Sequence, residues 1–184
     1  QGEGVIVAVI DTGILPAHPD FEAGALLEGY DFISDTFISR RPTNERVPGA
    51  LDYGDWNDDA SQCDVGGSSW HGTHVAGTVA EATNNRIGMA GVAPKATILP
   101  IRALGRCGGY TADIADAIVW ASGGTVAGMP ANPNPAQVIN MSLGGGGACS
   151  TSGATQLAIN GAVSRGTTVV VAAGNSNANA ANFS

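Results

Sequence analysis

The stretch GVIVAVID (residues 4–11) decides the fold. It is a nearly continuous run of small and β-branched apolar residues, which is typical of a strand buried on both faces in a parallel sheet. Three later stretches, ATILPIRAL (96–104), AQVINMSLG (136–144) and TTVVVAAGN (167–175), have the same character. The sequence therefore predicts at least four buried strands, the first of which ends at Asp11.

Helical patterns separate these strands. Residues 72–83 are small and compatible with a helix, and TADIADAIVWAS (111–122) is amphipathic, with Thr111 as the expected N-cap. Residues 151–166 predict a third helix that ends at Gly166 as the C′ residue. Strands alternating with helices predict right-handed βαβ units, and hence an α/β fold with a parallel sheet and helices on both faces.

Residues 23–69 lack a sustained period and are polar and rich in turn residues, so we expect loops there, with one short strand at GYDFI (29–33). The chain of 184 residues is 43% hydrophobic, which fits one globular domain or most of one. The first residues, QGEG, contain neither an initiator Met nor a signal segment, so we expect a piece of a longer precursor.

Charge and hydropathy exclude two classes of partner. The formal net charge is −8 and the isoelectric point is about 4.5, which argues against a nucleic-acid surface and is compatible with calcium binding. No apolar run reaches the roughly 18 residues of a membrane helix, so we expect no membrane partner.

Candidate catalytic residues follow the strands and begin a helix. In parallel sheets the functional residues gather at the carboxyl ends of the strands, and Asp11, Ser142 and Asn175 all occupy such ends. HGTHVAGTVA (71–80) places His71 on a Gly-Thr turn at the start of a helix, where an acid–base residue of a hydrolase could be presented.

Five motifs together resemble the subtilisin-like serine proteases, in order and approximate spacing, over essentially the whole chain. They are VAVIDTGI (7–14), HGTHVAGTVA (71–80), GVAPKATILPIRAL (91–104), INMSLGG (139–145) and VVVAAGN (169–175). The resemblance implies a three-layer α/β fold, incomplete at the C-terminus, in which residues 1–184 form part of the catalytic domain.

The resemblance also implies roles for three residues. Asp11 and His71 correspond to the Asp and His of an Asp-His-Ser triad, in which His accepts the proton of the serine nucleophile and Asp orients the imidazole. Asn175 corresponds to the amide donor of the oxyanion hole. The nucleophile motif, Gly-Thr-Ser-Met-Ala, does not occur in the sequence. We therefore expect a secreted, extracellular serine endopeptidase whose serine lies beyond this segment, and we expect the segment alone to be inactive.

The substrate side of the resemblance involves two backbone segments. Ser142, Leu143 and Gly144 correspond to the wall of the primary specificity pocket, along which substrate lies as an added strand, and Gly109 corresponds to the opposite edge. The implied partners are protein or peptide substrates, the remaining C-terminal part of the protease domain, and a pro-peptide or protein inhibitor.

A structural calcium site is also implied. Asp20 and Asn85 would supply side-chain oxygens, and Thr83, Ile87 and Met89 would supply carbonyl oxygens, a set of hard ligands that suits Ca²⁺. The acidic stretch DYGDWNDDASQCD (52–64) could hold a second calcium through Asp52, Asp55, Asp58 or Asp59, and a solvated acidic loop is an equal alternative.

Cysteine pairing follows from the same resemblance. Cys63 and Cys107 lie in the two loops that flank the cleft, and some secreted bacterial subtilases bridge the matching positions. Cys149 would then pair with a cysteine beyond Ser184. Both pairings require an oxidising compartment.

Three other interpretations compete with this resemblance. His71 and His74 could form a zinc pair, but the glutamate of HExxH is absent and the spacing is i, i+3. DTG (11–13) also occurs in aspartic proteases, which need a second such motif and are mostly β. The third is a non-catalytic, calcium-stabilised peptide-binding or scaffold module, which has no need of Asp11, His71 and Asn175 together.

Overall fold

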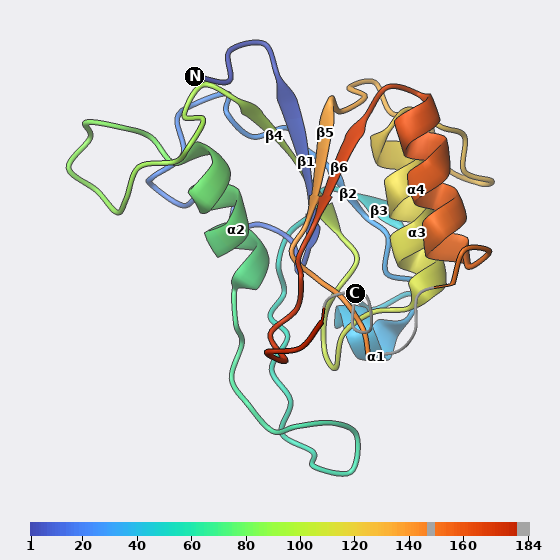
Figure 1. Ribbon diagram of the computed structural model, residues 1–184. Helices are drawn as coiled ribbons and strands as arrows, with labels where there is room; N and C mark the ends of the chain where they lie inside the picture. Colours follow the sequence, from blue (N-terminus) through green and yellow to red (C-terminus); the bar gives the residue numbers. More distant parts are fainter. Residues whose placement is uncertain (147–149, 180–184) are drawn as a thin grey trace.

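The structure, a computed structural model, describes residues 1–146 and 150–179 (Figure 1). Strands and helices alternate along much of the chain, as predicted. In order they are β1 (Ile6–Asp11), β2 (Tyr30–Asp31), α1 (Thr36–Ser39), β3 (Val47–Pro48), α2 (His71–Ala80), β4 (Thr97–Arg102), α3 (Thr111–Ala121), β5 (Val138–Met141), α4 (Ala154–Ser164) and β6 (Thr168–Val171).

The strands form one sheet in the order β3-β2-β4-β1-β5-β6. All neighbours are parallel except β2 and β3, which are antiparallel. The register of β1 and β4 runs from Ile6 opposite Thr97 to Asp11 opposite Arg102. The carboxyl ends of the parallel strands therefore lie at the same end of the sheet. β1 is a central strand of the sheet (Figure 1).

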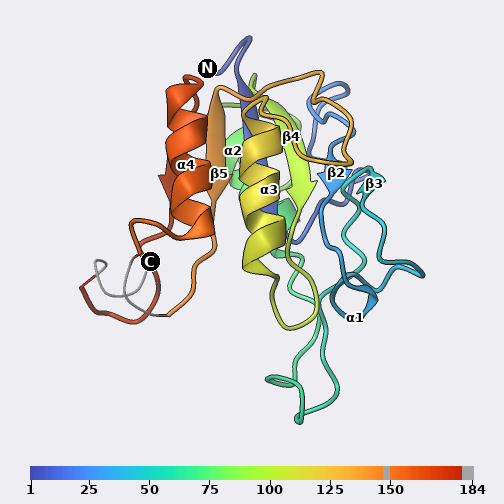
Figure 2. The same cartoon turned by 90° about the vertical axis from the view of Figure 1, so that its right-hand side faces the viewer.

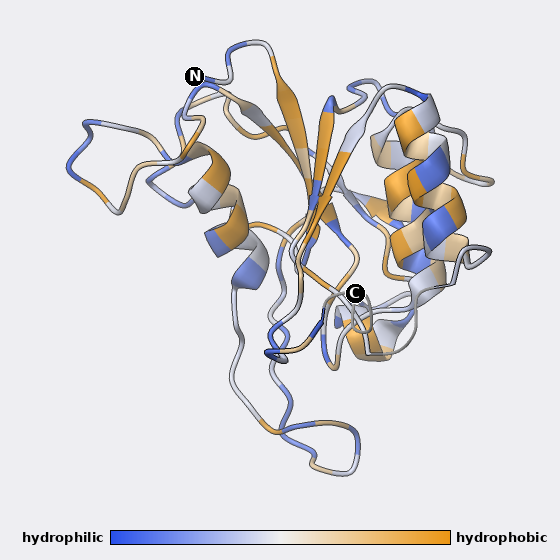
Figure 3. Cartoon of the chain, in the orientation of Figure 1, coloured by the Kyte–Doolittle hydropathy of each residue, from blue (hydrophilic) through white to orange (hydrophobic). Residues whose placement is uncertain are grey.

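Helices cover both faces of the sheet, which gives three layers. Figure 1 shows α2 on one side of the sheet and α3 and α4 on the other, and Figure 2 shows these two helices side by side in front of the strands. Alternate side chains of β1 enter the two cores: Ala8 and Ile10 face the α3–α4 layer, and Val7 and Val9 face the α2 layer. All four are buried. The prediction of a strand buried on both faces is confirmed, and the central strands and the sheet-facing sides of the helices are the most apolar parts in Figure 3.

The segment 23–69 contains more regular structure than the sequence predicted. The single predicted strand is present as β2, but α1 and β3 were not expected there. Asp35 caps α1 by accepting a hydrogen bond from the Phe37 N–H at 2.7 Å. Elements of two to four residues are too short to show a period, so their formation depends on contacts with the rest of the chain.

Element ends also differ from the prediction. Thr111 is the first residue of α3, and the N-cap is Tyr110, which makes no side-chain capping bond, so the N-cap assignment was wrong. Gly166 follows α4 with φ of 92°, as predicted for a C′ glycine. The last strands end at Met141 and Val171, three and four residues before their predicted ends. The residues that follow leave the sheet and are free to line a site.

One edge of the sheet is open in the described part of the chain. The last strand in the sheet order, β6, is mostly exposed, and so are the apolar side chains of Leu157, Val163, Val170 and Val171 on α4 and β6. None of the helices in the described ranges is both long and apolar enough to cross a bilayer.

Candidate active site

An aspartate and a histidine meet at the carboxyl end of the central strand. Asp11 is the last residue of β1, and His71 is the first residue of α2. The His71 Nδ1 atom lies 2.8 Å from Asp11 Oδ1 and 3.0 Å from Oδ2. The Asp11 side chain is 1% exposed and the His71 side chain is 47% exposed. The carboxylate is thus buried, whereas the imidazole is open to a ligand.

Burial sets the electrostatics of this pair. Removal from water raises the pKa of the Asp11 carboxyl above its usual value, because burial disfavours its charged form. Hydrogen bonds from His71 and from the Thr12 N–H act in the opposite direction, and the neighbouring charge of Asp52 raises the pKa further. A buried carboxylate against Nδ1 orients the imidazole, an arrangement that suits acid–base chemistry at the other ring nitrogen.

Close packing against β1 determines how α2 begins. A Cβ at Gly72 would lie 2.2 Å from the Gly13 carbonyl oxygen, so only glycine permits this approach. Trp70, at the N-cap, has φ of 52° and makes no side-chain capping bond. The first amides of the helix are instead accepted by neighbouring hydroxyl groups. His71 N–H donates to Ser69 Oγ at 3.2 Å, and Gly72 N–H donates to Thr12 Oγ1 at 2.9 Å.

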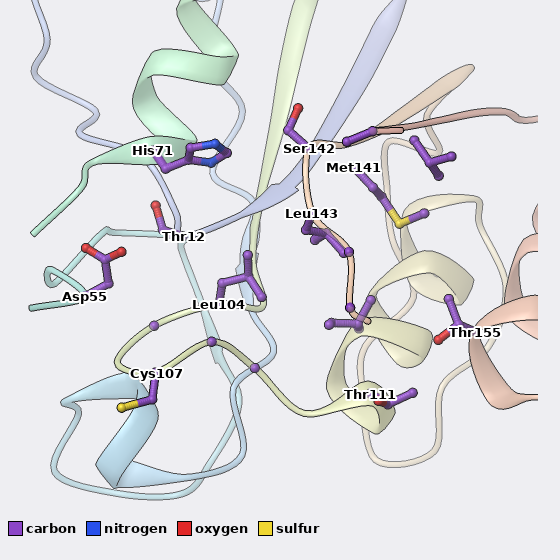
Figure 4. Close-up of a pocket in the computed structure, with 18 of the residues that line it drawn as sticks. Thr12, Asp55, His71, Leu104, Cys107, Thr111, Met141, Ser142, Leu143 and Thr155 are labelled. Atoms are coloured by element: carbon purple, nitrogen blue, oxygen red, sulfur yellow. The ribbon is translucent and has the colours of Figure 1, made fainter. Parts of the chain in front are cut away.

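His71 faces a cleft of about 870 Å³. Figure 4 shows His71, at the start of α2, and Ser142 and Leu143, from the segment after β5, around the same pocket. The four residues predicted to contact substrate all line it: Gly109, Ser142, Leu143 and Gly144. Apolar side chains from α3, β5 and α4 form the rest of one wall, namely Ile114, Met141 and Ile159.

Asn175 is not brought to the histidine by any contact in the structure. It lies four residues beyond the end of β6, is exposed, and is absent from the cleft lining, whereas Val171 and Ala172 belong to it. Its role in an oxyanion hole stays a prediction.

The structure contains the disulfide between Cys63 and Cys107, with the two Cα atoms 5.8 Å apart. It joins the acidic loop to the segment between β4 and α3 that forms one side of the cleft. Arg106 strengthens this junction, since its guanidinium donates to Asn57 Oδ1 at 2.9 and 2.7 Å. Cys149 lies outside the described residues, as do 147 and 148.

Two of the residues predicted to bind calcium, Asn85 and Met89, contact a third, Asp20, in the structure. Asp20 is fully buried, and its carboxylate accepts hydrogen bonds from the Asn85 amide at 2.6 Å and from the Met89 N–H at 3.2 Å. The loop 83–89 therefore wraps around one buried carboxylate, and its Thr83 and Ile87 carbonyls belong to the same loop. Carboxylate, amide and carbonyl oxygens are the ligands that suit Ca²⁺, but the groups that Asp20 meets in the structure are the N–H donors of Asn85 and Met89. The calcium set stays a prediction.

The acidic loop has no comparable arrangement. Asp52 and Asp55 are engaged by hydroxyl and amide groups, and Asp59 by Ser61. Within the described ranges, no three side chains of His, Cys, Asp or Glu are grouped to hold a metal ion. The second calcium ion and the solvated acidic loop both stay predictions.

Sequence reasoning did not connect four residues with the histidine: Thr12, Asp52, Asp55 and Ser69. It considered Asp52 and Asp55 only as calcium ligands. Thr12 Oγ1 donates to Asp52 Oδ2 at 2.7 Å, and Ser69 Oγ donates to Asp55 Oδ2 at 2.7 Å. The available signal was local: hydroxyl residues directly follow Asp11 and closely precede His71.

The chain is similar to known proteins over nearly its whole length. Residues 2–184 match the model of the subtilase family. An "Extracellular protease" of Xanthomonas campestris is 63% identical over 182 residues, and "Thermitase" of Thermoactinomyces vulgaris is 36% identical over 184 residues. A solved protease structure from Pseudoalteromonas arctica is 57% identical and superposes with a TM-score of 0.91.

These relatives are longer than the chain. The match covers 97% of this chain and 30% of the Xanthomonas protein, 100% and 52% for thermitase, and 99% and 53% for the Pseudoalteromonas structure. The family match nevertheless extends over nearly all 184 residues and includes the Asp11 and His71 motifs. This chain belongs to the subtilase family and has its subtilisin-like α/β fold.

Proposed function

We propose that this chain is the Asp- and His-bearing part of a secreted serine endopeptidase that hydrolyses peptide bonds in proteins. The observation that carries the proposal is the hydrogen bond of 2.8 Å between buried Asp11 and His71, whose imidazole faces the cleft. The names of the relatives, which include an extracellular protease and an extracellular basic protease, support secretion and proteolysis.

In this proposal His71 is the acid–base residue. Because Nδ1 is held by Asp11, Nε2 takes the proton of the attacking serine and later gives it to the leaving amine. Asp11 stabilises the imidazolium that forms between these steps. Asn175 donates a hydrogen bond to the oxyanion of the tetrahedral intermediate, after the segment beyond β6 has brought its amide to the cleft.

The substrate is an extended peptide. It lies between the segment Ser142–Gly144 and the segment around Gly109, and it forms backbone hydrogen bonds as an added strand. Internal packing requires a glycine at Gly109, since a Cβ there would lie 2.2 Å from the Ala103 carbonyl oxygen. A pro-peptide or a protein inhibitor would use the same backbone segments.

The nucleophile is proposed to come from a further part of the protease domain. Two observations support this: the exposed apolar edge at α4 and β6, and the greater length of the relatives. Such a part would cover β6, which removes an aggregation-prone sheet edge. The 184 residues alone would then bind substrate weakly and would not cleave it.

A structural calcium ion is proposed for the loop around Asp20. Asp20 and Asn85 would hold it by their side chains, and Thr83, Ile87 and Met89 by their carbonyls. The ion would stabilise the loop and takes no part in the chemistry.

The proposed function is tested on the full-length protein with a serine-directed fluorophosphonate probe, followed by peptide mapping. We expect one serine outside residues 1–184 to be labelled, and casein or a peptide amide to be cleaved. The His71→Ala variant should lose labelling and lower kcat by about 10³-fold or more, because the serine is no longer deprotonated.

His74→Ala serves as the matched control, because His74 lies on the same helix and is not one of the residues that line the cleft. It should leave labelling and kcat unchanged. Full cleavage by the His71→Ala protein would refute the assignment of His71. A wild-type protein that binds peptide but neither labels nor cleaves would favour the peptide-binding module.

A further inference from the structure

We infer that Asp52 is a positioning residue for His71, acting through the Thr12 hydroxyl, and that Asp55 supports the same helix turn through Ser69. The inference rests on the proposed function, because it assigns a task to these carboxylates only if His71 is the acid–base residue. Neither carboxylate faces the imidazole itself. Each instead holds a hydroxyl group that accepts a backbone N–H of α2.

The hydrogen bonds that lead from Asp52 through the Thr12 hydroxyl to the Gly72 N–H, here called the Asp52 relay, are buried. Asp52 and Thr12 are each 4% exposed. Asp52 Oδ2 accepts the Thr12 hydroxyl at 2.7 Å, and the same hydroxyl oxygen accepts the Gly72 N–H at 2.9 Å. The other carboxylate oxygen, Oδ1, accepts the Gly54 N–H at 2.8 Å. Because the hydroxyl proton is committed to Asp52, the oxygen lone pair is directed at Gly72.

Thr12 also belongs to the other half of the catalytic pair. Its backbone N–H donates to Asp11 Oδ1 at 2.7 Å. One residue thus fixes the carboxylate of Asp11 by its amide and the first turn of α2 by its hydroxyl. Asp52 keeps that hydroxyl in place, so it couples the two elements that present Asp11 and His71.

The second relay lies nearer the surface. Asp55 accepts from the Ser69 N–H at 2.6 Å and from the Ser69 hydroxyl at 2.7 Å, and Ser69 Oγ accepts the His71 N–H at 3.2 Å. Both Asp55 and Ser69 line the cleft. Solvent competes with these exposed bonds, so we expect a smaller contribution than that of Asp52.

The relays replace a conventional cap. α2 begins without a capping side chain at Trp70, so the two amides at its start depend on these hydroxyls for their partners. Catalytic groups need placement to within a fraction of an ångström, and an error of about 1 Å can cost about 100-fold in rate. Loss of the Asp52 relay should therefore reduce turnover while substrate binding is retained.

The test measures kcat and KM of the full-length protein for a peptide amide. We expect Asp52→Ala and Thr12→Val each to lower kcat by about 10- to 100-fold and to leave KM within about twofold. The double variant should be no slower than the slower single variant, because both changes break one relay. Thr12→Ser, which keeps the hydroxyl, should have a kcat close to that of the wild type, unlike Thr12→Val. Asp55→Ala should lower kcat by less than Asp52→Ala.

A spectroscopic measurement complements the kinetics and does not require turnover. The proton of His71 Nδ1, shared with Asp11, should give a low-field ¹H resonance in the wild type. We expect Asp52→Ala and Thr12→Val to broaden or shift this resonance. The near-isosteric Thr12→Val change keeps the inference testable if Asp52→Ala fails to fold.

The matched control is Asp113→Asn. Asp113 is also a buried carboxylate that accepts a serine hydroxyl, that of Ser34 at 3.1 Å, but it lies on α3 and makes no contact with α2. It should lower stability and leave kcat and the low-field resonance unchanged. The inference is overturned by wild-type kcat in Asp52→Ala and Thr12→Val, by additive effects in the double variant, or by an equal kcat loss in Asp113→Asn. Failure of the proposed function would appear differently, as full activity of His71→Ala.

Discussion

At the scale of single residues, Asp11 combines burial with a charge that the proposed chemistry requires. The carboxylate is fully buried at the end of β1, and burial is the largest cause of its raised pKa. A raised pKa in the folded state means that the native protein holds the Asp11 proton more tightly than the unfolded chain does. Ionised Asp11 therefore lowers the stability of the fold at neutral pH.

The change Asp11→Asn should consequently stabilise the protein at pH 7 to 8 while it lowers kcat by about 10⁴-fold. The neutral amide still accepts a hydrogen bond from His71 but avoids a buried charge. The stability advantage should shrink as pH falls through the raised pKa of Asp11 toward its usual value of 3.8, because wild-type Asp11 then becomes neutral as well.

Urea unfolding at a series of pH values measures this difference, in full-length protein whose nucleophile has been replaced by alanine to prevent autolysis. Asp116→Asn is the control, since its carboxylate is 42% exposed and pairs with Arg46 at the surface. It should give no gain in stability at neutral pH. An Asp11→Asn protein less stable than wild type at pH 7 would contradict the argument.

At the scale of elements, the docking of α2 on the segment after β1 determines where His71 lies. Helix and loop approach so closely at Gly72 that a Cβ would meet the Gly13 carbonyl oxygen at 2.2 Å and the Gly13 nitrogen at 3.0 Å. Both contacts are with backbone, which cannot rotate away. The glycine of the HGTH motif is therefore a packing requirement, beside the catalytic role proposed for His71.

Gly72→Ala should destabilise the protein by about 1–3 kcal/mol, the usual cost of overpacking, and should also reduce kcat because the helix must move away from Asp11. Glycine-to-alanine changes within helices normally stabilise by up to about 1 kcal/mol. The sign of the effect is thus reversed at this position.

Gly161→Ala in α4 is the matched comparison, because a Cβ there meets only the flexible Arg165 guanidinium, at 3.3 Å. Thermal unfolding and kcat should show this variant to be as stable as wild type or more so, with normal turnover. If both alanine variants behaved alike, close packing at Gly72 would not be the cause.

At the scale of the whole molecule, a few specific contacts hold the long connections between strands and helices in place. The disulfide between Cys63 and Cys107 joins the acidic loop to the wall of the cleft, and Asp20 gathers the loop 83–89. The open edge at β6 contrasts with these closed parts and is the proposed contact with the rest of the protease domain.

Removal of calcium is expected to lower Tm by about 5–10 °C in the full-length protein. An ion at about 100 times its Kd contributes about 2.7 kcal/mol, and in a domain of about 150–250 residues each kcal/mol shifts Tm by about 2–4 °C. Thermal unfolding with and without a chelator measures the effect.

The Asp20→Asn variant should begin at the lower Tm and show no further loss on chelation, because it lacks the only carboxylate of the proposed site. Asp116→Asn should respond to chelation like the wild type. Identical Tm values for the wild-type protein with and without chelator would rule out the calcium proposal.

Much of the fold could be predicted because its signals are local. β1 and β4 are apolar runs whose side chains are buried on both faces, and α3 shows its period within eleven residues. The N-cap of α3 was assigned one residue too late. Tyr110 has an extended backbone and Thr111 is already helical, and the apolar pattern of the sequence does not distinguish these two positions. α1 and β3 were missed since neither is long enough to have a period.

The sequence by itself determined the order of the longer strands and helices, the α/β class with helices on both faces of a parallel sheet, and the motifs that contain Asp11 and His71, because each depends on residues close together in the chain. Only the tertiary structure decided that Asp52 holds Thr12, which is 40 residues away, and that Thr12 holds Gly72, which is 60 residues away. Such contacts depend on the path of the loop 52–69 across the sheet edge. Local propensity contains no information about that path, since it results from packing, a disulfide and buried hydrogen bonds acting together.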